Sequence, residues 1–266
     1  MTPAELLAHY DNAQLWDAPS AAAATVDVPA AYQQQLAVRQ LRLARGEHPR
    51  GFKIGFTNRS IWPRYNVFAP IWGTVWSTTL SFSESAQCTL SLAGTCQPRI
   101  EPETVFGMRA TPAASASLQD LWDAIDWVAP GFEVVQSHLP DWKFTIPDTV
   151  ADGALHARLL VGRRIPVREL SSSAQELDRV LASADVALVK DGAVVERGVG
   201  ANVLDSPLRA LHHFLQELRA CPGAPDLQAG DVVTTGTWTD AWPIAPGEHW
   251  AARFSRPLAS LQVQLV

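Results

Sequence analysis

The chain has 266 residues, of which 47% are hydrophobic and 18% are charged, and its formal net charge is -6. This composition is typical of a globular protein, and the acidic balance disfavours nucleic acid or an anionic membrane as the main partner. The N-terminal sequence lacks the basic and apolar regions of a signal peptide, and no apolar run reaches about 18 residues. We therefore expect a cytoplasmic protein with no membrane and no nucleic-acid partner.

The first fifty residues predict helices. Apolar side chains recur at near-helical spacing over 3–16 and over 29–46, and an Ala-rich stretch with two prolines connects them over 18–29. We expect an N-terminal helical lobe over residues 1–50, followed by a β-rich catalytic domain over 51–266.

After Gly51, short β-favouring runs alternate with Gly, Pro and Asn. Because strands and helices do not alternate regularly, a doubly wound parallel sheet is not expected. Asp191-Gly192 lies between two of the runs and predicts a β-hairpin, since this dipeptide supplies the positive φ angles of a type I′ turn. Helices are predicted over 117–127, 174–183 and 206–220. The predicted strands cover 52–56, 73–76, 88–92, 99–105, 131–135, 157–161, 186–189, 194–197, 231–235, 249–254 and 261–266.

Two acidic side chains lie two residues apart in one predicted strand, at Glu101 and Glu103. Alternate residues of a strand share a face, so these carboxylates would repel each other unless a proton or a cation lies between them. Oxygen ligands of this kind suit Mg2+ or Mn2+. On spacing alone, a solvated strand face remains the simpler interpretation.

Two further charged side chains stand among apolar neighbours. Glu133 lies in the predicted strand over 131–135, where a solvent-facing position is the alternative to a site in the interior. Lys53 is flanked by apolar residues and glycines. Partial desolvation would lower its pKa and suit it to acid or base chemistry, whereas a lysine that extends to solvent from an edge strand is the common alternative.

Several short blocks occur in a characteristic order from about Leu36 to the C-terminus. In this order they resemble the 2-hydroxypentadienoate hydratase and 4-oxalocrotonate decarboxylase family, part of the fumarylacetoacetate hydrolase superfamily. The blocks are Lys53-Ile54-Gly55-Phe56-Thr57-Asn58, Pro70-Ile71-Trp72-Gly73, Ile100-Glu101-Pro102-Glu103, Phe132-Glu133-Val134-Val135, Asp141-Trp142-Lys143, Asp148-Thr149-Val150-Ala151-Asp152, Leu227-Gln228-Ala229-Gly230-Asp231 and Gly236-Thr237-Trp238-Thr239.

The resemblance implies an α+β fold, with a mixed β-sheet roll of the fumarylacetoacetate hydrolase C-terminal type behind the helical lobe. It implies that Glu101, Glu103 and Glu133 hold Mg2+ or Mn2+, and that Lys53 and Asp152 are catalytic. It also implies a homo-oligomer, dimeric or larger. The residues expected to bind substrate are Thr57, Pro70, Trp72, Gly73, Thr237 and Trp238.

The implied reaction is the addition of water to a 2-hydroxydienoate or 2-oxoenoate in aromatic or steroid catabolism, a metal-dependent lyase activity. A 2-oxo-acid decarboxylase, a tautomerase and a C–C hydrolase share the same metal ligands and remain alternatives. A catalytically inactive partner subunit is a further one.

The sequence departs from the family pattern around the expected site. An acidic residue is replaced by Phe68, and other substitutions occur at Gln136, His138 and Gly153. Trp72, Trp238 and Trp242 occupy blocks that frame the family's pocket. We expect from them a drier pocket for a bulkier or more apolar acid, although extra core packing or an oligomer contact would equally account for the indoles.

Overall fold

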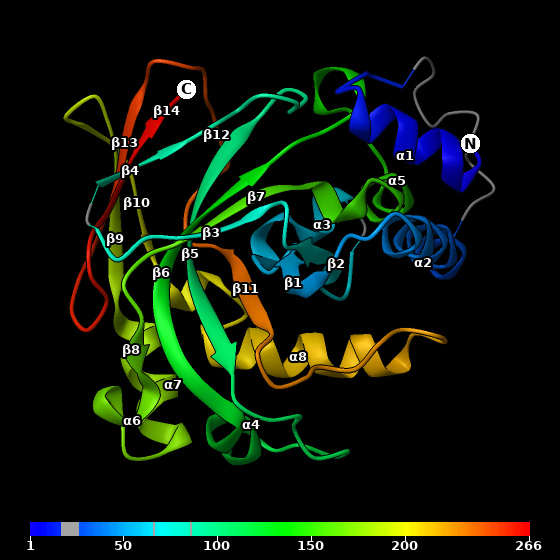
Figure 1. Ribbon diagram of the computed structural model, residues 1–266. Helices are drawn as coiled ribbons and strands as arrows, with labels where there is room; N and C mark the ends of the chain where they lie inside the picture. The colour runs from blue at the N-terminus through cyan, green and yellow to red at the C-terminus, as the bar shows by residue number, and fades with distance from the viewer. Residues whose placement is uncertain (17–26, 66, 86) are drawn as a thin grey trace.

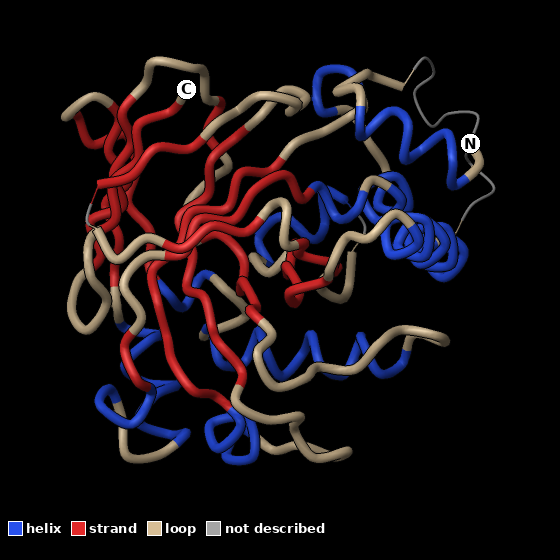
Figure 2. The backbone as a smooth tube through the Cα atoms, in the orientation of Figure 1, coloured by secondary structure: helices blue, strands red, loops and turns tan. Residues whose placement is uncertain are grey.

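Two curled β-sheets with helices around them make up the described part of the chain, residues 1–16, 27–65, 67–85 and 87–266 of a computed structural model (Figures 1 and 2). The α+β fold with mixed sheets is as predicted. Among the described helices, none combines the length and hydropathy that a bilayer crossing requires. The helices are α1 (Pro3–Asp11), α2 (Val28–Ala44), α3 (Trp62–Tyr65), α4 (Leu118–Ala124), α5 (Ile146–Ala151), α6 (Val167–Leu170), α7 (Ala174–Ser183) and α8 (Pro207–Ala220).

The larger sheet carries the strands of the expected site and has the order β2-β1-β11-β5-β6-β7-β3, with β12 beside β5 and β8 beside β6. Its strands are β1 (Pro49–Gly55), β2 (Ile71–Trp76), β3 (Leu80–Phe82), β5 (Arg99–Met108), β6 (Ile125–Val135), β7 (His156–Val161), β8 (Ile165–Pro166), β11 (Val232–Thr237) and β12 (Trp242–Pro243). The central pairs β11–β5, β5–β6 and β6–β7 are antiparallel, whereas β1 joins β11 in parallel.

The smaller sheet has the order β10-β9-β13-β14-β4. The predicted Asp191-Gly192 hairpin is confirmed: β9 and β10 are antiparallel, and the two turn residues have φ angles of 48° and 88°. The strands of this sheet are β4 (Gln87–Leu90), β9 (Asp185–Lys190), β10 (Ala193–Val199), β13 (His249–Phe254) and β14 (Leu261–Leu265).

The N-terminal helices lie together at one side of the larger sheet (Figure 1), where α2 contacts α5. The predicted helices over 3–16 and 29–46 are confirmed as α1 and α2, and most of the predicted connection over 18–29 lies outside the described residues. A Thr2–Glu5 capping box starts α1. The division into domains at residue 50 stays a prediction.

The helix predicted over 117–127 is wrong at its C-terminal end. A capping box between Ser117 and Asp120 starts α4, but the chain turns into β6 at Ile125. The residues that follow favour a strand, because Ile125 is β-branched and Trp127 is aromatic, and both pair with β5 across the sheet. Tertiary pairing thus outweighs the helical spacing of this segment.

A close approach between two strands fixes the position of β1. Gly51 of β1 pairs with Val232 of β11, and a Cβ at Gly51 would lie 1.9 Å from the carbonyl oxygen of Val232. The φ angle of Gly51 is +131°, in a region that L side chains rarely adopt. Lys53 follows two residues later, so this contact also places a residue of the expected site.

We predict that Gly51→Ala lowers the free energy of unfolding by about 2 kcal/mol or more, because the methyl group meets backbone that cannot yield. Urea denaturation measures the change. Gly46→Ala is the matched control: its φ is also positive, but a Cβ there meets no described atom within 4 Å, so only about 1 kcal/mol of backbone cost is expected. Equal losses in the two variants would contradict the steric argument.

Candidate metal centre and active-site cavity

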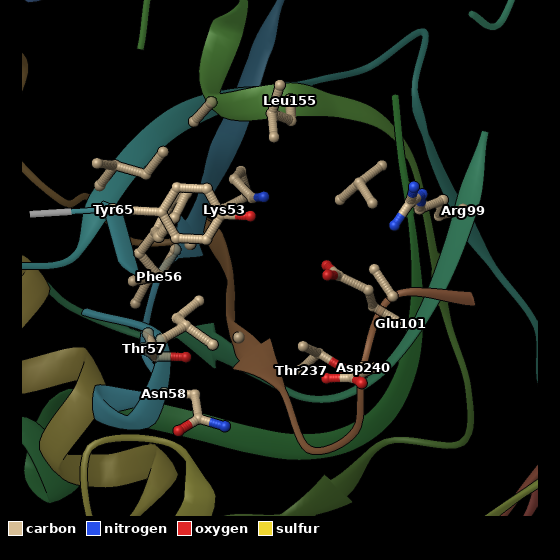
Figure 3. Close-up of a pocket in the computed structure, with 18 of the residues that line it drawn as sticks. Lys53, Phe56, Thr57, Asn58, Tyr65, Arg99, Glu101, Leu155, Thr237 and Asp240 are labelled. Carbon is tan, nitrogen blue, oxygen red and sulfur yellow. The ribbon is translucent and has the colours of Figure 1, made fainter. Parts of the chain in front are cut away.

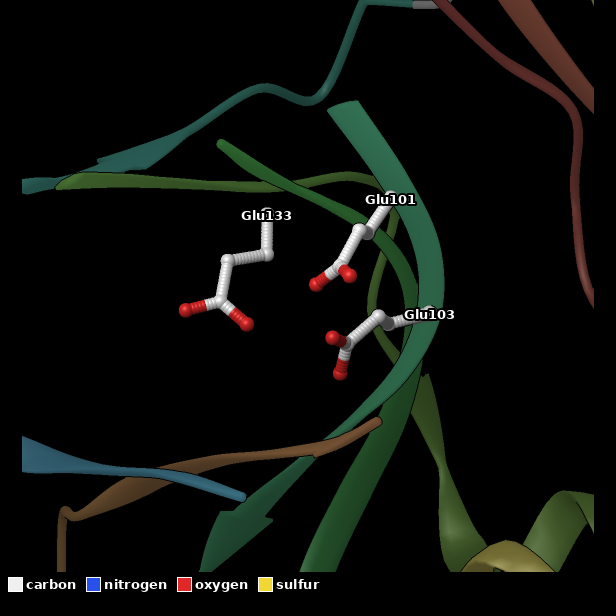
Figure 4. Close-up of side chains that lie close together, drawn as sticks. All are labelled: Glu101, Glu103 and Glu133. Carbon is white, nitrogen blue, oxygen red and sulfur yellow. The ribbon is translucent and has the colours of Figure 1, made fainter. Parts of the chain in front are cut away.

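Three carboxylates converge between β5 and β6. The antiparallel register sets Glu101 directly opposite Glu133, and Glu103 follows two residues along the same face of β5. One carboxylate oxygen from each residue lies within 4.8 Å of the others, and the three side chains point toward a common centre (Figure 4). Glu103 and Glu133 are fully buried, while Glu101 is partly exposed. The sequence-predicted ligands therefore come together in the fold.

A bulge in β11 holds Glu103. The pairing of β11 with β5 shifts between Thr234 and Thr237, and in this interval the backbone N–H groups of Thr235 and Gly236 both donate to Glu103 Oε2, at 2.9 and 2.7 Å. Gly236 has a φ of +96°, and a Cβ there would lie 1.8 Å from the hydroxyl oxygen of Thr57. Only glycine fits this bulge, which re-aims two donors at one carboxylate.

Glu133 is held by two side chains that come from other strands. His156 Nδ1 lies 2.8 Å from Glu133 Oε1, and Lys53 Nζ lies 3.4 Å from Oε2. Burial lowers the pKa of His156 well below its usual value, with nearby cations adding to the effect. The ring is therefore neutral, so Nδ1–H donates to Glu133 and Nε2 accepts from the Thr79 hydroxyl at 2.9 Å. The sequence analysis did not single out His156, because its partner lies 23 residues away across the sheet.

The cluster carries more negative charge than its hydrogen bonds satisfy. Burial and the charges of the other two carboxylates raise the pKa of Glu101 to about 8, although the ammonium of Lys53 opposes this shift. Burial and the charge of Glu133 likewise raise the pKa of Glu103 well above its usual value, and burial raises that of Glu133. Glu103 Oε1 is buried and receives no hydrogen bond from the described residues, and Glu133 Oε2 has only its 3.4 Å ion pair with Lys53 Nζ. Buried carboxylate oxygens with so few donors fit a hard divalent cation.

Lys53 differs from the expectation of a lowered pKa. Burial alone would lower the pKa of its ammonium, but the carboxylates of Glu133, Glu101 and Glu103 outweigh burial and raise it. The residue is 3% exposed and lies in β1, well inside the sheet, so it does not extend to solvent from an edge. Neutralisation of the carboxylates by a cation would remove the cause of this upward shift.

A cavity of about 320 Å³ opens beside the cluster and brings Lys53, Thr57, Glu101 and Thr237 to one space (Figure 3). Ala154 and Leu155, both with positive φ angles, form part of the wall. Other side chains of the lining were not predicted as a set, because they come from segments that are distant in the sequence. They include Phe56, Tyr65, Arg99, Trp142 and Phe144.

Five of the residues predicted for the site lie elsewhere. Both oxygens of Asp152 bind His138, at 2.6 and 2.9 Å, so this carboxylate anchors a loop and borders a separate small cavity. Trp72 and Trp238 are at most 1% exposed and pack in the hydrophobic core, where Trp72 stacks on Tyr32. The described residues that line the main cavity include none of Asp152, Pro70, Trp72, Gly73 and Trp238.

The structure also shows where the residues that depart from the family pattern lie. Gln136 is buried and accepts a hydrogen bond from the backbone of Cys96, and His138 holds Asp152 as described above. Phe68 is 80% exposed and does not line the main cavity. The prediction that tryptophans of these blocks dry the cavity does not hold for Trp72 and Trp238. The cavity is lined instead by a different aromatic set.

Comparison with known proteins matches these observations. Residues 71–265 match the fumarylacetoacetate (FAA) hydrolase C-terminal family. A 2-hydroxyhexa-2,4-dienoate hydratase from Comamonas testosteroni is 32% identical over 83% of this chain and 80% of its own. A 4-oxalocrotonate decarboxylase from Pseudomonas putida is 30% identical over 98% of this chain and 96% of its own.

The solved structure of 4-oxalocrotonate decarboxylase from Pseudomonas putida G7, complexed with magnesium and adipate, superimposes with a TM-score of 0.88 at 26% identity, covering 99% of this chain and 95% of that one. The fold, the extent of the family match and the identity to these relatives agree. The chain belongs to the fumarylacetoacetate hydrolase superfamily, among the 2-hydroxydienoate hydratases and 4-oxalocrotonate decarboxylases.

Proposed function

We propose that this protein is a divalent-metal-dependent lyase that adds water to a 2-hydroxydienoate or 2-oxoenoate in aromatic or steroid catabolism. The observation that carries the proposal is the cluster of Glu101, Glu103 and Glu133, of which Glu101 lines a cavity that also contains Lys53. The hydratases among its relatives support the choice of reaction. The cytoplasmic location and the homo-oligomeric state stay predictions.

The trio would hold Mg2+ or Mn2+, and a cation there would act as a Lewis acid that stabilises the enolate charge of a 2-oxo or 2-enol acid. Lys53 presents an ammonium to the same cavity, positioned to neutralise the substrate carboxylate or to deliver a proton to the carbon chain. Thr57 and Thr237 flank the cavity and orient the acid. The His156 hydrogen bond keeps the Glu133 carboxylate turned toward the centre.

A 2-oxo-acid decarboxylase or tautomerase is the second candidate. Hydration needs a base that positions water, and Asp152, which the family resemblance implies to be catalytic, is bound to His138 outside the cavity. Decarboxylation and tautomerisation need the electron sink and a proton donor such as Lys53, both of which the cavity can supply. Product analysis with a panel of 2-hydroxydienoates and 2-oxoenedioates and Mg2+ separates the reactions: release of CO2 identifies a decarboxylase, and a gained hydroxyl without loss of carbon identifies a hydratase.

Glu103→Gln is predicted to abolish turnover while the protein stays folded, because an amide carries no charge for the cation yet keeps the shape that the β11 bulge encloses. Turnover is followed spectrophotometrically and folding by circular dichroism. Glu84→Gln, which removes only a surface pair with Arg164, serves as the control and should leave activity unchanged. Full activity of Glu103→Gln would refute the assignment of the trio. A wild-type protein that binds neither Mg2+ nor Mn2+ by calorimetry would indicate an inactive partner subunit instead.

The metal-free protein is predicted to lose stability as the pH rises from about 5 to about 8. The pKa of Glu101 is 4.5 in its ordinary state and about 8 in the fold, so in this window the folded chain binds more protons than the unfolded chain, and its free energy of unfolding falls with rising pH. Melting temperatures recorded across the window check the slope. Added Mn2+ should raise the melting temperature most at the alkaline end, and Glu101→Gln should flatten the slope in the metal-free state. A metal-free protein that becomes more stable with rising pH would contradict this account.

His156→Ala is predicted to weaken Mn2+ binding about 10- to 100-fold, because Glu133 loses the donor that orients it. Isothermal titration calorimetry gives the affinity. His156→Asn keeps a nitrogen donor and should recover part of the loss, which a merely space-filling role of the ring would not predict. Unchanged affinity in both variants would show that Lys53 and the backbone alone position Glu133.

A further inference from the structure

Part of the cavity wall is aromatic, and Phe56 and Tyr65 lie across the cavity from Glu101 (Figure 3). Phe56 lies edge-on to Tyr65 with ring centroids 5.3 Å apart, and Tyr65 stacks on Phe144 at 5.6 Å. Trp142 adds a fourth ring 6.2 Å from Phe144. All four side chains line the same cavity as Lys53 and Glu101. An acid group held at the metal centre would therefore point its carbon chain toward a cluster of rings, two of which Figure 3 labels.

A second cavity adjoins the aromatic wall. Tyr65, Ile71 and Phe144 line both the cavity and a neighbouring space of about 680 Å³, which is otherwise lined largely by apolar groups that include Phe68 and Ile146. The first cavity has the volume of about ten water molecules, so a five-carbon acid would not fill it. Tyr65, Ile71 and Phe144 therefore form an apolar wall common to the two spaces.

The charges of the site favour a substrate with one carboxylate. The three glutamates and Asp240, which lines the same cavity, carry four negative charges, and Lys53, Arg99 and a divalent cation would carry four positive charges. A first carboxylate of the ligand binds the cation, whereas a second would add a charge that the lining does not compensate. Arg99 is also engaged already, with its guanidinium 4.2 Å from the centre of the Trp142 ring. A second carboxylate at the far end of the ligand would meet the phenyl and phenol rings of Phe56, Tyr65 and Phe144.

We propose that the natural substrate is a monocarboxylic 2-oxo or 2-enol acid whose distal end bears an aryl or similarly bulky apolar group, held against Phe56, Tyr65 and Phe144. This inference rests on the proposed function, because it takes the acid end of the ligand to lie at the metal centre. The apolar lining that was expected from the tryptophans is provided by these rings, because Trp72 and Trp238 lie in the core.

The test compares the binding of three saturated acids to the Mg2+-loaded protein by isothermal titration calorimetry. Saturated acids lack the double bond that hydration requires, so affinity is measured apart from turnover. The probes are 2-oxopentanoate, 2-oxo-5-phenylpentanoate and the dicarboxylate 2-oxoadipate. We expect the phenyl compound to bind about 10-fold or more tightly than 2-oxopentanoate, because its ring is removed from water. We expect 2-oxoadipate to bind no more tightly than 2-oxopentanoate.

Phe144→Leu should reduce the affinity for the phenyl compound about 3- to 10-fold and affect 2-oxopentanoate less, since an aromatic contact is lost and a smaller apolar side chain remains. Phe82→Leu changes a phenyl group on β3 that is 42% exposed and lies outside the cavity, so it serves as the control. If circular dichroism shows that Phe144→Leu is unfolded, Phe56→Leu replaces it with the same expectation.

The outcomes separate the two proposals. Equal affinity for the phenyl compound and 2-oxopentanoate would overturn the inference and leave the proposed function standing. The inference would also be overturned if 2-oxoadipate bound most tightly of the three acids, because the distal end of the preferred ligand would then be anionic. Loss of 2-oxoadipate binding in Arg99→Met would identify Arg99 as the partner of that carboxylate. Failure of all three acids to bind to a protein that does bind Mg2+ would overturn the proposed function itself.

Discussion

Repulsion among three buried carboxylates is the constraint around which this fold is organised. The β5–β6 register forces Glu101 and Glu133 to face each other, an arrangement that destabilises a sheet when the charges are alike. The surrounding structure offsets this cost at specific atoms. The bulge of β11 supplies two N–H donors, β1 supplies Lys53 and β7 supplies His156. Strands β11, β1 and β7 thus each contribute a group that contacts a carboxylate of the cluster.

The fold accordingly divides the cavity into two chemically different ends. Central strands of the larger sheet provide the charged end, where backbone N–H groups hold Glu103 and the side chains of His156 and Lys53 hold Glu133. The aromatic end is built from loops and short helices: Phe56 follows β1, Tyr65 ends α3, and Trp142 and Phe144 flank a tight turn. A shared acid-binding end on strands and a variable end on loops suits a family in which related members act on different acids.

Much of this arrangement could be predicted from the sequence. The hairpin at Asp191-Gly192 and helices α2, α7 and α8 follow from local turn chemistry and helical periodicity. The clustering of Glu101, Glu103 and Glu133 did not follow from spacing, and it was the resemblance to a family that brought these residues together. Ile125 shows why the end of α4 was missed: pairing across the sheet outweighed a local helical pattern.

The parts of the site that could not be predicted depend on contacts distant in sequence. The preference of Asp152 for His138 and the burial of Trp72 and Trp238 in the core are properties of packing, which block order does not encode. The same holds for the Glu133–His156 pair. The family blocks that contain Trp72, Trp238 and Trp242 favoured these indoles as the apolar lining, whereas the rings that line the cavity lie after β1, at the end of α3 and over 140–144.

The contact between Gly236 and Thr57 has a consequence for how this site can change over time. The Thr57 hydroxyl occupies the space that a side chain at 236 would need, and the same glycine donates to Glu103. Positions 57 and 236 therefore constrain each other: a bulkier residue at either would displace the donor from Glu103. We therefore expect substitutions that change substrate preference in the loops that carry the rings, and not at positions 57 and 236.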